Sequence, residues 1–89
     1  MKSLRQFREE QMGKVHDGYL VNCCRIEGKY LIAFNHSAGA GWWEVLHIER
    51  RDGSEDSELK AALEAGEICT GGATYEDCVD GLYESGFIC

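Results

Sequence analysis

The hydrophobic residues of this chain follow two periodicities, which separate a strand-forming middle from helical ends. In the middle, aromatic and β-branched residues crowd three segments bounded by glycine, a pattern typical of β-strands. These predicted strands are Tyr19–Ile26, Lys29–Asn35 and Trp42–Arg50. Glu27 and Gly28 form a two-residue connection between the first two, so we expect a tight hairpin in which Gly28 supplies a positive φ angle. The pattern predicts a three-stranded antiparallel meander.

The second predicted strand alternates in a way that indicates which face of the sheet is buried. Tyr30, Ile32 and Phe34 share one face, and the smaller set of Leu31, Ala33 and Asn35 shares the other, because successive side chains of a strand point in opposite directions. We expect the face with the three large residues to lie against the helices.

Capping residues and helical spacing predict three helices. Ser3 caps the first, which runs to about Met12 and stops at Gly13, with Gln6 placed to complete a capping box. The second covers Ser57–Ala65 and ends at Gly66. The segment Glu67–Gly72 that follows is expected to be a loop or one short strand.

The last helix has the strongest pattern of the three. Thr74 is its cap, Gly86 ends it, and Phe87 or Ile88 is expected to close the core behind it. Its apolar residues recur at helical spacing: Tyr75, Cys78, Val79 and Leu82. We therefore predict an α+β fold in the order α-β-β-β-α-α, with the helices on one face of a three-stranded antiparallel sheet and residues 1–89 forming a single domain.

The length and composition exclude several classes of protein. A chain of 89 residues buries only about 60 to 65% of its unfolded surface, so a large enclosed active site is not expected. Its longest apolar runs, such as Tyr30–Phe34, are far shorter than the roughly 20 residues that cross a bilayer. We expect no membrane segment and no membrane partner.

The cysteines and the N-terminal segment indicate a reducing compartment. Five cysteines cannot all pair, and their positions (23, 24, 69, 78 and 89) include no C-x-x-C spacing. The first twelve residues carry charges throughout and lack the apolar centre of a secretion signal. We expect a cytoplasmic protein whose cysteines are free thiols.

The net charge of −7 is concentrated in one part of the chain. Residues 1–51 contain eight basic and six acidic side chains, whereas residues 52–89 contain ten acidic side chains and one base, Lys60. An acidic region of this kind repels nucleic acid and attracts basic surfaces. We therefore expect no direct binding of nucleic acid, although the strands carry aromatic residues on which bases could stack: Tyr19, Tyr30, Trp42 and Trp43.

The acidic side chains of the last helix form a line that we call the acidic ridge: Glu76, Asp77, Asp80 and Glu84. Glu76, Asp80 and Glu84 follow at i, i+4 and i+8, where like charges destabilise a helix by a few tenths of a kcal/mol per pair. Glu76 and Asp77 lie near the positive end of the helix dipole, but Asp80 and Glu84 do not. The ridge is either a solvated face or a docking surface for a Lys/Arg-rich partner.

The sequence NHSAGAGWWEVLHIE (Asn35–Glu49) places a glycine-rich loop before two tryptophans. A phosphate-binding loop would lead into a helix and carry a lysine, but this loop leads into a predicted strand and contains no base. Trp42 and Trp43 are neighbours in that strand, so one of them must lie near the surface. An exposed Trp is either a shield for the sheet or an anchor for a protein partner.

A catalytic or metal-binding interpretation would use Cys23 or Cys24 with His36 or His47. Nucleophilic catalysis needs a histidine beside the thiol and a third group that orients it, and no such group can be assigned. Zinc ligands from the cysteines and histidines lack the spacing of a finger or ribbon. We expect no catalytic residue, no metal and no cofactor.

The hypothesis from sequence is a small acidic, non-enzymatic module, monomeric or homodimeric, that binds the basic surface of a protein partner. Its expected contact residues are Trp42, Trp43, Glu76, Asp77, Asp80 and Glu84. One form of this hypothesis is an inhibitor that mimics nucleic acid and occupies a nucleic-acid-binding surface, as do phage or mobile-element proteins that counter bacterial defence. The alternatives are a metal- or thiol-dependent protein using Cys23 and Cys24 with His36 and His47, and a structural homodimer subunit.

Overall fold

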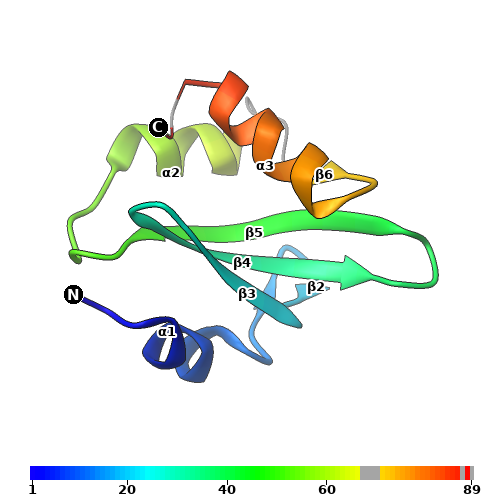
Figure 1. The fold of residues 1–89 in the computed structure, drawn as a ribbon, viewed down its shortest axis with the longest axis horizontal. Coiled ribbons are helices and arrows are strands. Elements are labelled where there is room, and N and C mark those ends of the chain that lie inside the picture. The colour runs from blue at the N-terminus through cyan, green and yellow to red at the C-terminus, as the bar shows by residue number, and fades with distance from the viewer. Residues whose placement is uncertain (67–70, 87, 89) are drawn as a thin grey trace.

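The computed structural model describes residues 1–66, 71–86 and 88 and has an α+β fold with helices on both faces of an antiparallel sheet (Figure 1). The sheet has four strands in spatial order β3 (Cys23–Glu27), β4 (Tyr30–Ser37), β5 (Trp42–Arg50) and β6 (Gly71–Gly72). A separate two-stranded sheet pairs β1 (Val15–His16) with β2 (Tyr19–Leu20). The helices are α1 (Leu4–Gln11), α2 (Ser57–Ala65) and α3 (Tyr75–Glu84).

The expectation that all helices cover one face of the sheet is wrong, because β4 is buried on both sides. Tyr30, Ile32 and Phe34 face α2 and α3, as expected, and join a core with Leu59 and Leu82. On the opposite face α1 covers a second core, made of Phe7, Val21, Cys24, Leu31 and Ala33. A continuous apolar run such as Tyr30–Phe34 is what a strand between two layers requires.

The predicted strand Tyr19–Ile26 is also wrong as a single element. The chain reverses at Asp17 and Gly18, which both have positive φ angles (52° and 86°). Tyr19–Leu20 therefore pairs antiparallel with the preceding segment, Val15–His16. Strand β3 then begins at Cys23. Between the two sheets, the Asn22 side chain donates to the His36 carbonyl (2.9 Å) and accepts from the His36 amide (2.7 Å), replacing a backbone pair.

Two further details correct the three-stranded meander. Glu27 pairs with Tyr30, so the hairpin turn is Gly28–Lys29 rather than Glu27–Gly28, although Gly28 has the expected positive φ of 57°. At the other side of the sheet, β6 pairs with Trp43 and Glu44 of β5 and adds the fourth strand. Residues 67–70 of the segment predicted as a loop or short strand lie outside the described residues.

The three predicted helices are confirmed with their caps. Ser3 and Gln6 form the capping box of α1, and Gly66 adopts the left-handed conformation at the end of α2. The Thr74 side chain accepts from the Asp77 amide at the start of α3. Ile88 is buried behind α3, as expected, whereas Phe87 lies outside the described residues. Within the described ranges, the helices are too short or too polar to cross a bilayer.

A β-bulge in β5 turns two consecutive side chains toward α1. Ala33 pairs with His47 and Phe34 pairs with Val45, so Leu46 is the extra residue. Leu46 packs on the core beneath α1, and the His47 ring stacks on Phe7 with 6.2 Å between ring centroids. The bulge therefore places a titratable ring at the junction of α1 with the sheet.

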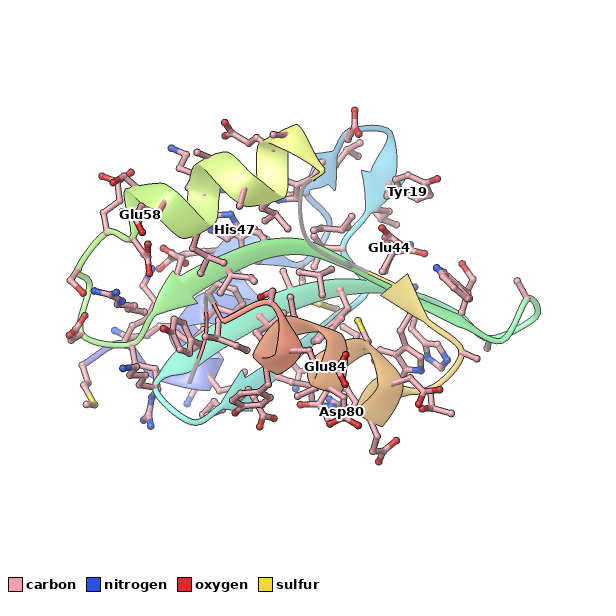
Figure 2. The ribbon with its side chains drawn as sticks, turned by 90° about the horizontal axis from the view of Figure 1, so that it is seen from above. Tyr19, Glu44, His47, Glu58, Asp80 and Glu84 are labelled. Atoms are coloured by element: carbon pink, nitrogen blue, oxygen red, sulfur yellow. The ribbon has the colours of Figure 1, made fainter. Side chains whose placement is uncertain are left out.

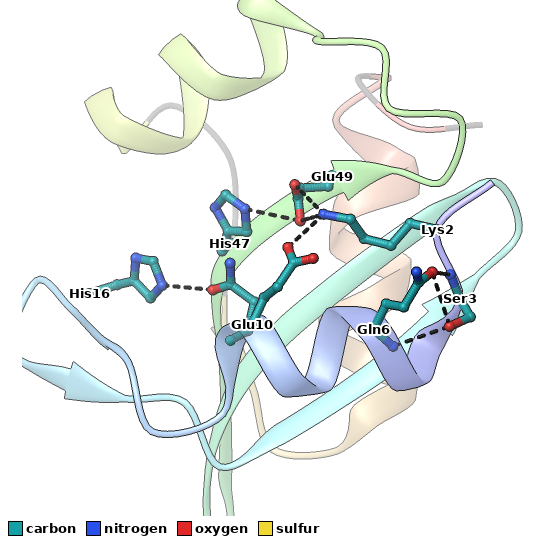
Figure 3. Close-up of polar contacts among 8 residues, drawn as sticks. Lys2, Ser3, Gln6, Glu10, His16, His47 and Glu49 are labelled. Atoms are coloured by element: carbon teal, nitrogen blue, oxygen red, sulfur yellow. Dashed lines mark hydrogen bonds and ion pairs between the residues drawn. The ribbon is translucent and has the colours of Figure 1, made fainter.

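Polar contacts tie α1 and the β1–β2 hairpin to this junction (Figure 3). The Lys2 ammonium lies 2.7 Å from Glu10 and 3.2 Å from Glu49, which links the start of α1 to β5. His16 contacts the Gln11 side chain at 3.1 Å, and its ring stacks on His47 with centroids 5.5 Å apart. Because these contacts connect three elements, the ionisation of His47 bears on the stability of the fold.

We predict that the protein loses stability as the pH falls from 7.5 to 5.5. Burial lowers the pKa of His47 below its ordinary value of 6.5; Glu49 opposes this shift, and His16 and Lys14 add to it. Below about pH 6.5 the unfolded chain binds a proton that folded His47 resists, so the free energy of unfolding decreases until the folded pKa is passed. Urea denaturation across this range measures the effect, with His47→Gln as the control that should flatten the profile. A free energy of unfolding that stays constant or rises toward pH 5.5 in the wild type would contradict it.

Candidate functional site

The acidic ridge lies on the solvent side of α3, away from the sheet. Cys78, Val79 and Leu82 form the buried side of the helix, and the four ridge residues are exposed. Figure 2 shows Asp80 and Glu84 projecting outward from the helix. The helical spacing seen in the sequence therefore becomes one continuous line of carboxylates.

The ridge carboxylates have no ion-pair partner within the described part of the chain. The ion pairs of the described residues involve acidic side chains outside the ridge. Their basic partners are Lys2, Arg5, His47, Arg50 and Lys60. Lys60 of α2, the one Lys or Arg after residue 51, lies 3.6 Å from Glu55, which precedes the helix. The negative charge of α3 is thus left without internal compensation and is available to an external cation.

Two tyrosines fix α3 against the edge of the sheet. The Tyr75 hydroxyl donates to one Glu27 oxygen at 3.0 Å, and the Tyr83 hydroxyl donates to the other at 2.8 Å. Burial, together with the hydrogen bond to Glu27, raises the pKa of Tyr75 to about 12, so this phenol keeps its proton at neutral pH. These contacts give the ridge a defined position, which reduces the cost of ordering it on binding.

The two tryptophans point to opposite faces of the sheet, as expected for strand neighbours, and only Trp42 is largely exposed, at 48%. Trp43 packs against the α3 side of the core. Its ring stacks on His36 at 4.0 Å and meets Phe34 and Tyr75 edge-on, each at 5.5 Å between centroids. Of the pair, Trp42 is therefore the one whose ring can reach a partner.

The two glycines of β6 confirm that Trp42 and the ridge lie on different faces. A side chain at Gly71 would come within 2.7 Å of the Trp42 ring, and one at Gly72 would come within 2.8 Å of the Cys78 backbone in α3. Adjacent strand residues face opposite ways, so Trp42 lies on the far side of the sheet from α3. The structure does not join these predicted contact residues into one surface.

The cysteine and histidine residues of the alternative hypothesis are distributed over both faces of the sheet. Cys24 is buried beneath α1, whereas Cys23 packs on the opposite core, and His36 stacks on Trp43. Burial raises the pKa of the Cys24 thiol, which disfavours the nucleophilic thiolate. Across the described residues, no three His, Cys, Asp or Glu side chains are grouped closely enough to hold a metal ion.

A groove that was not predicted from sequence lies between the β1–β2 hairpin, β5 and α2. Its volume is about 740 Å³, and its lining includes Tyr19, Glu44, His47 and Glu64. The local signal was the Asp17-Gly18 turn, a pair that favours hairpins, but nothing in the sequence indicates that this hairpin lies beside α2.

Comparisons with protein-family models, curated proteins and solved structures found no match to this chain.

Proposed function

We propose that this chain is a small acidic, non-enzymatic protein-binding module of the cytoplasm that docks its α3 ridge on the basic surface of a protein partner. The observation that carries the proposal is the line of four exposed carboxylates without ion-pair partners in the described chain. The alignment costs the helix a few tenths of a kcal/mol per like-charged pair. An external cationic surface would offset that repulsion.

The spacing of the ridge also fits a partner that binds nucleic acid. Successive turns of α3 present carboxylates about 6 Å apart, since four residues rise 1.5 Å each. Phosphates follow one another along a nucleic-acid strand at a comparable distance of several ångströms. We propose that the module acts as an inhibitor that occupies such a surface, in the manner of phage or mobile-element proteins that counter bacterial defence.

Trp42 is the second contact residue of the proposal, and Trp43 supports the sheet beneath it. Trp42 donates from Nε1 to Glu44 at 2.9 Å, so the exposed ring is held in one orientation. Since it lies on the other face from the ridge, a partner that uses both must reach around an edge of the sheet.

The test is competition between the module and nucleic acid for a captured partner. Immobilised protein is incubated with host-cell lysate at low salt, and retained proteins are identified by mass spectrometry. We expect a basic, nucleic-acid-binding protein that is released when duplex DNA or RNA is added. Simultaneous binding of the module and nucleic acid by the purified partner would contradict the inhibitor form of the proposal.

A further inference from the structure

The groove between the β1–β2 hairpin, β5 and α2 has an acidic and partly apolar lining. Among the described residues that line it, the carboxylates are Asp17, Glu44 and Glu64, and Lys60 is the one Lys or Arg. Lys60 lies 3.6 Å from Glu55. Val15 and Leu63 supply apolar surface. In Figure 2 the groove is framed by the hairpin with Tyr19, by α2, and by β5 with Glu44 and His47.

Exposed apolar and aromatic side chains gather at the hairpin end of this groove. Val15 is 63% exposed and Tyr19 is 53% exposed. Exposed apolar surface that borders polar groups marks interaction sites. Trp42 is joined to the groove through Glu44, which lines it and accepts the indole N–H at 2.9 Å.

The orientation of Trp42 is set before any partner arrives. Its ring lies over Gly71, where a side chain would come within 2.7 Å, and Glu44 holds its nitrogen. An aromatic side chain that is already ordered loses little entropy on binding. Because Gly71 has no side chain, the Trp42 ring can lie over it in this orientation.

We propose that this groove binds an extended segment bearing arginine or lysine, with the cationic head group at Glu44 and its aliphatic stem on the apolar lining. Carboxylate pairing and the exposed ring of Tyr19 both favour a cation, and the stems of Arg and Lys pack on apolar surface. This inference rests on the proposed function, because it assigns a second segment of the same basic partner. The groove is separate from the α3 ridge, so the two are tested independently.

The test is an NMR titration of ¹⁵N-labelled protein at low salt with the peptide acetyl-Arg-Ala-Arg-Ala-Arg-Ala-amide. The control peptide carries citrulline in place of arginine, which keeps the shape and removes the charge. We expect saturable shifts of amides in the hairpin, in β5 and in α2 with the arginine peptide, and none with the citrulline peptide. Glu44→Gln should weaken binding about fivefold, as loss of one charge-assisted contact does, and Tyr19→Ala should weaken it as well.

Glu58→Gln is the matched control, since Glu58 is an exposed carboxylate of α2 outside the groove lining. It removes the same charge and should change the affinity less than twofold. Equal effects of Glu44→Gln and Glu58→Gln, or shifts confined to α3, would overturn the groove proposal while leaving the ridge proposal standing. Conversely, a partner whose binding is weakened by Glu44→Gln but not by charge reversal on α3 would support the groove and overturn the ridge.

Discussion

Leu82→Ala is expected to lower the free energy of unfolding by about 2 to 5 kcal/mol, the range for truncation of a buried leucine. Leu82 is fully buried and joins α3 to the core that contains Tyr30, Ile32 and Phe34. Because Leu82 is enclosed by the core, truncation of its side chain leaves a cavity that solvent does not fill. Urea denaturation monitored by circular dichroism measures the loss.

Glu84→Ala provides the surface control for this prediction, because Glu84 is exposed on the same helix. Surface substitutions away from special contacts change stability by less than about 0.5 kcal/mol. If Leu82→Ala also changed the free energy of unfolding by less than 0.5 kcal/mol, α3 would not be packed as described. The position of the acidic ridge would then be wrong as well.

The helices could be predicted from sequence because the signals that begin and end them are local. The side chains of Ser3 and Thr74 accept hydrogen bonds from backbone amides in the first turn of α1 and α3. Gly66 ends α2 by adopting the left-handed conformation. The exposed side of α3 followed from the same periodicity, since Cys78 and Leu82 fix which face is buried. These features do not depend on the path of the rest of the chain.

The layering of the sheet could not be predicted in the same way. The run Tyr30–Phe34 is apolar at every position. Its alternation of larger and smaller side chains predicts one buried face, whereas both faces of β4 are buried. Strands β1, β2 and β6 have two residues each, too short for any alternation pattern. Their pairing depends on contacts between distant segments, such as Gly71 with Glu44.

The same limit applies to the candidate contact residues. Strand geometry requires Trp42 and Trp43 to face opposite ways, but the exposed one is decided by the face that α3 covers. The groove likewise arises from three segments that the sequence does not connect. Local pattern thus predicted the ridge, whereas tertiary packing determined that Trp42 is the exposed tryptophan and that it lies on the other face of the sheet.

Charge reversal on the ridge is expected to weaken docking on a basic partner. Asp80→Lys combined with Glu84→Lys should slow association with the captured basic partner about tenfold or more at low salt, because surface charges act mainly on the on-rate. Salt near 0.5 M should shrink the difference from wild type, since the Debye length falls to about 4 Å. Both positions are exposed, so the fold should be retained.

The matched control places the same change of charge on the other face of the sheet. Glu9 and Glu10 are exposed residues of α1. Glu9 pairs with the exposed Arg5, and Glu10 pairs with Lys2, which also contacts Glu49 of β5. Such pairs contribute less than about 1 kcal/mol, so Glu9→Lys with Glu10→Lys should also fold. This variant separates the local effect of the ridge from the effect of net charge.

The association rate constant of the purified partner, measured at low salt with wild type and both double variants, tests the role of the ridge most directly. If the ridge docks on the partner, Asp80→Lys with Glu84→Lys should reduce the rate constant about tenfold or more, and Glu9→Lys with Glu10→Lys should reduce it much less. Equal rate constants for the ridge variant and the wild type would contradict this docking, and the ridge would then be a solvated face of α3.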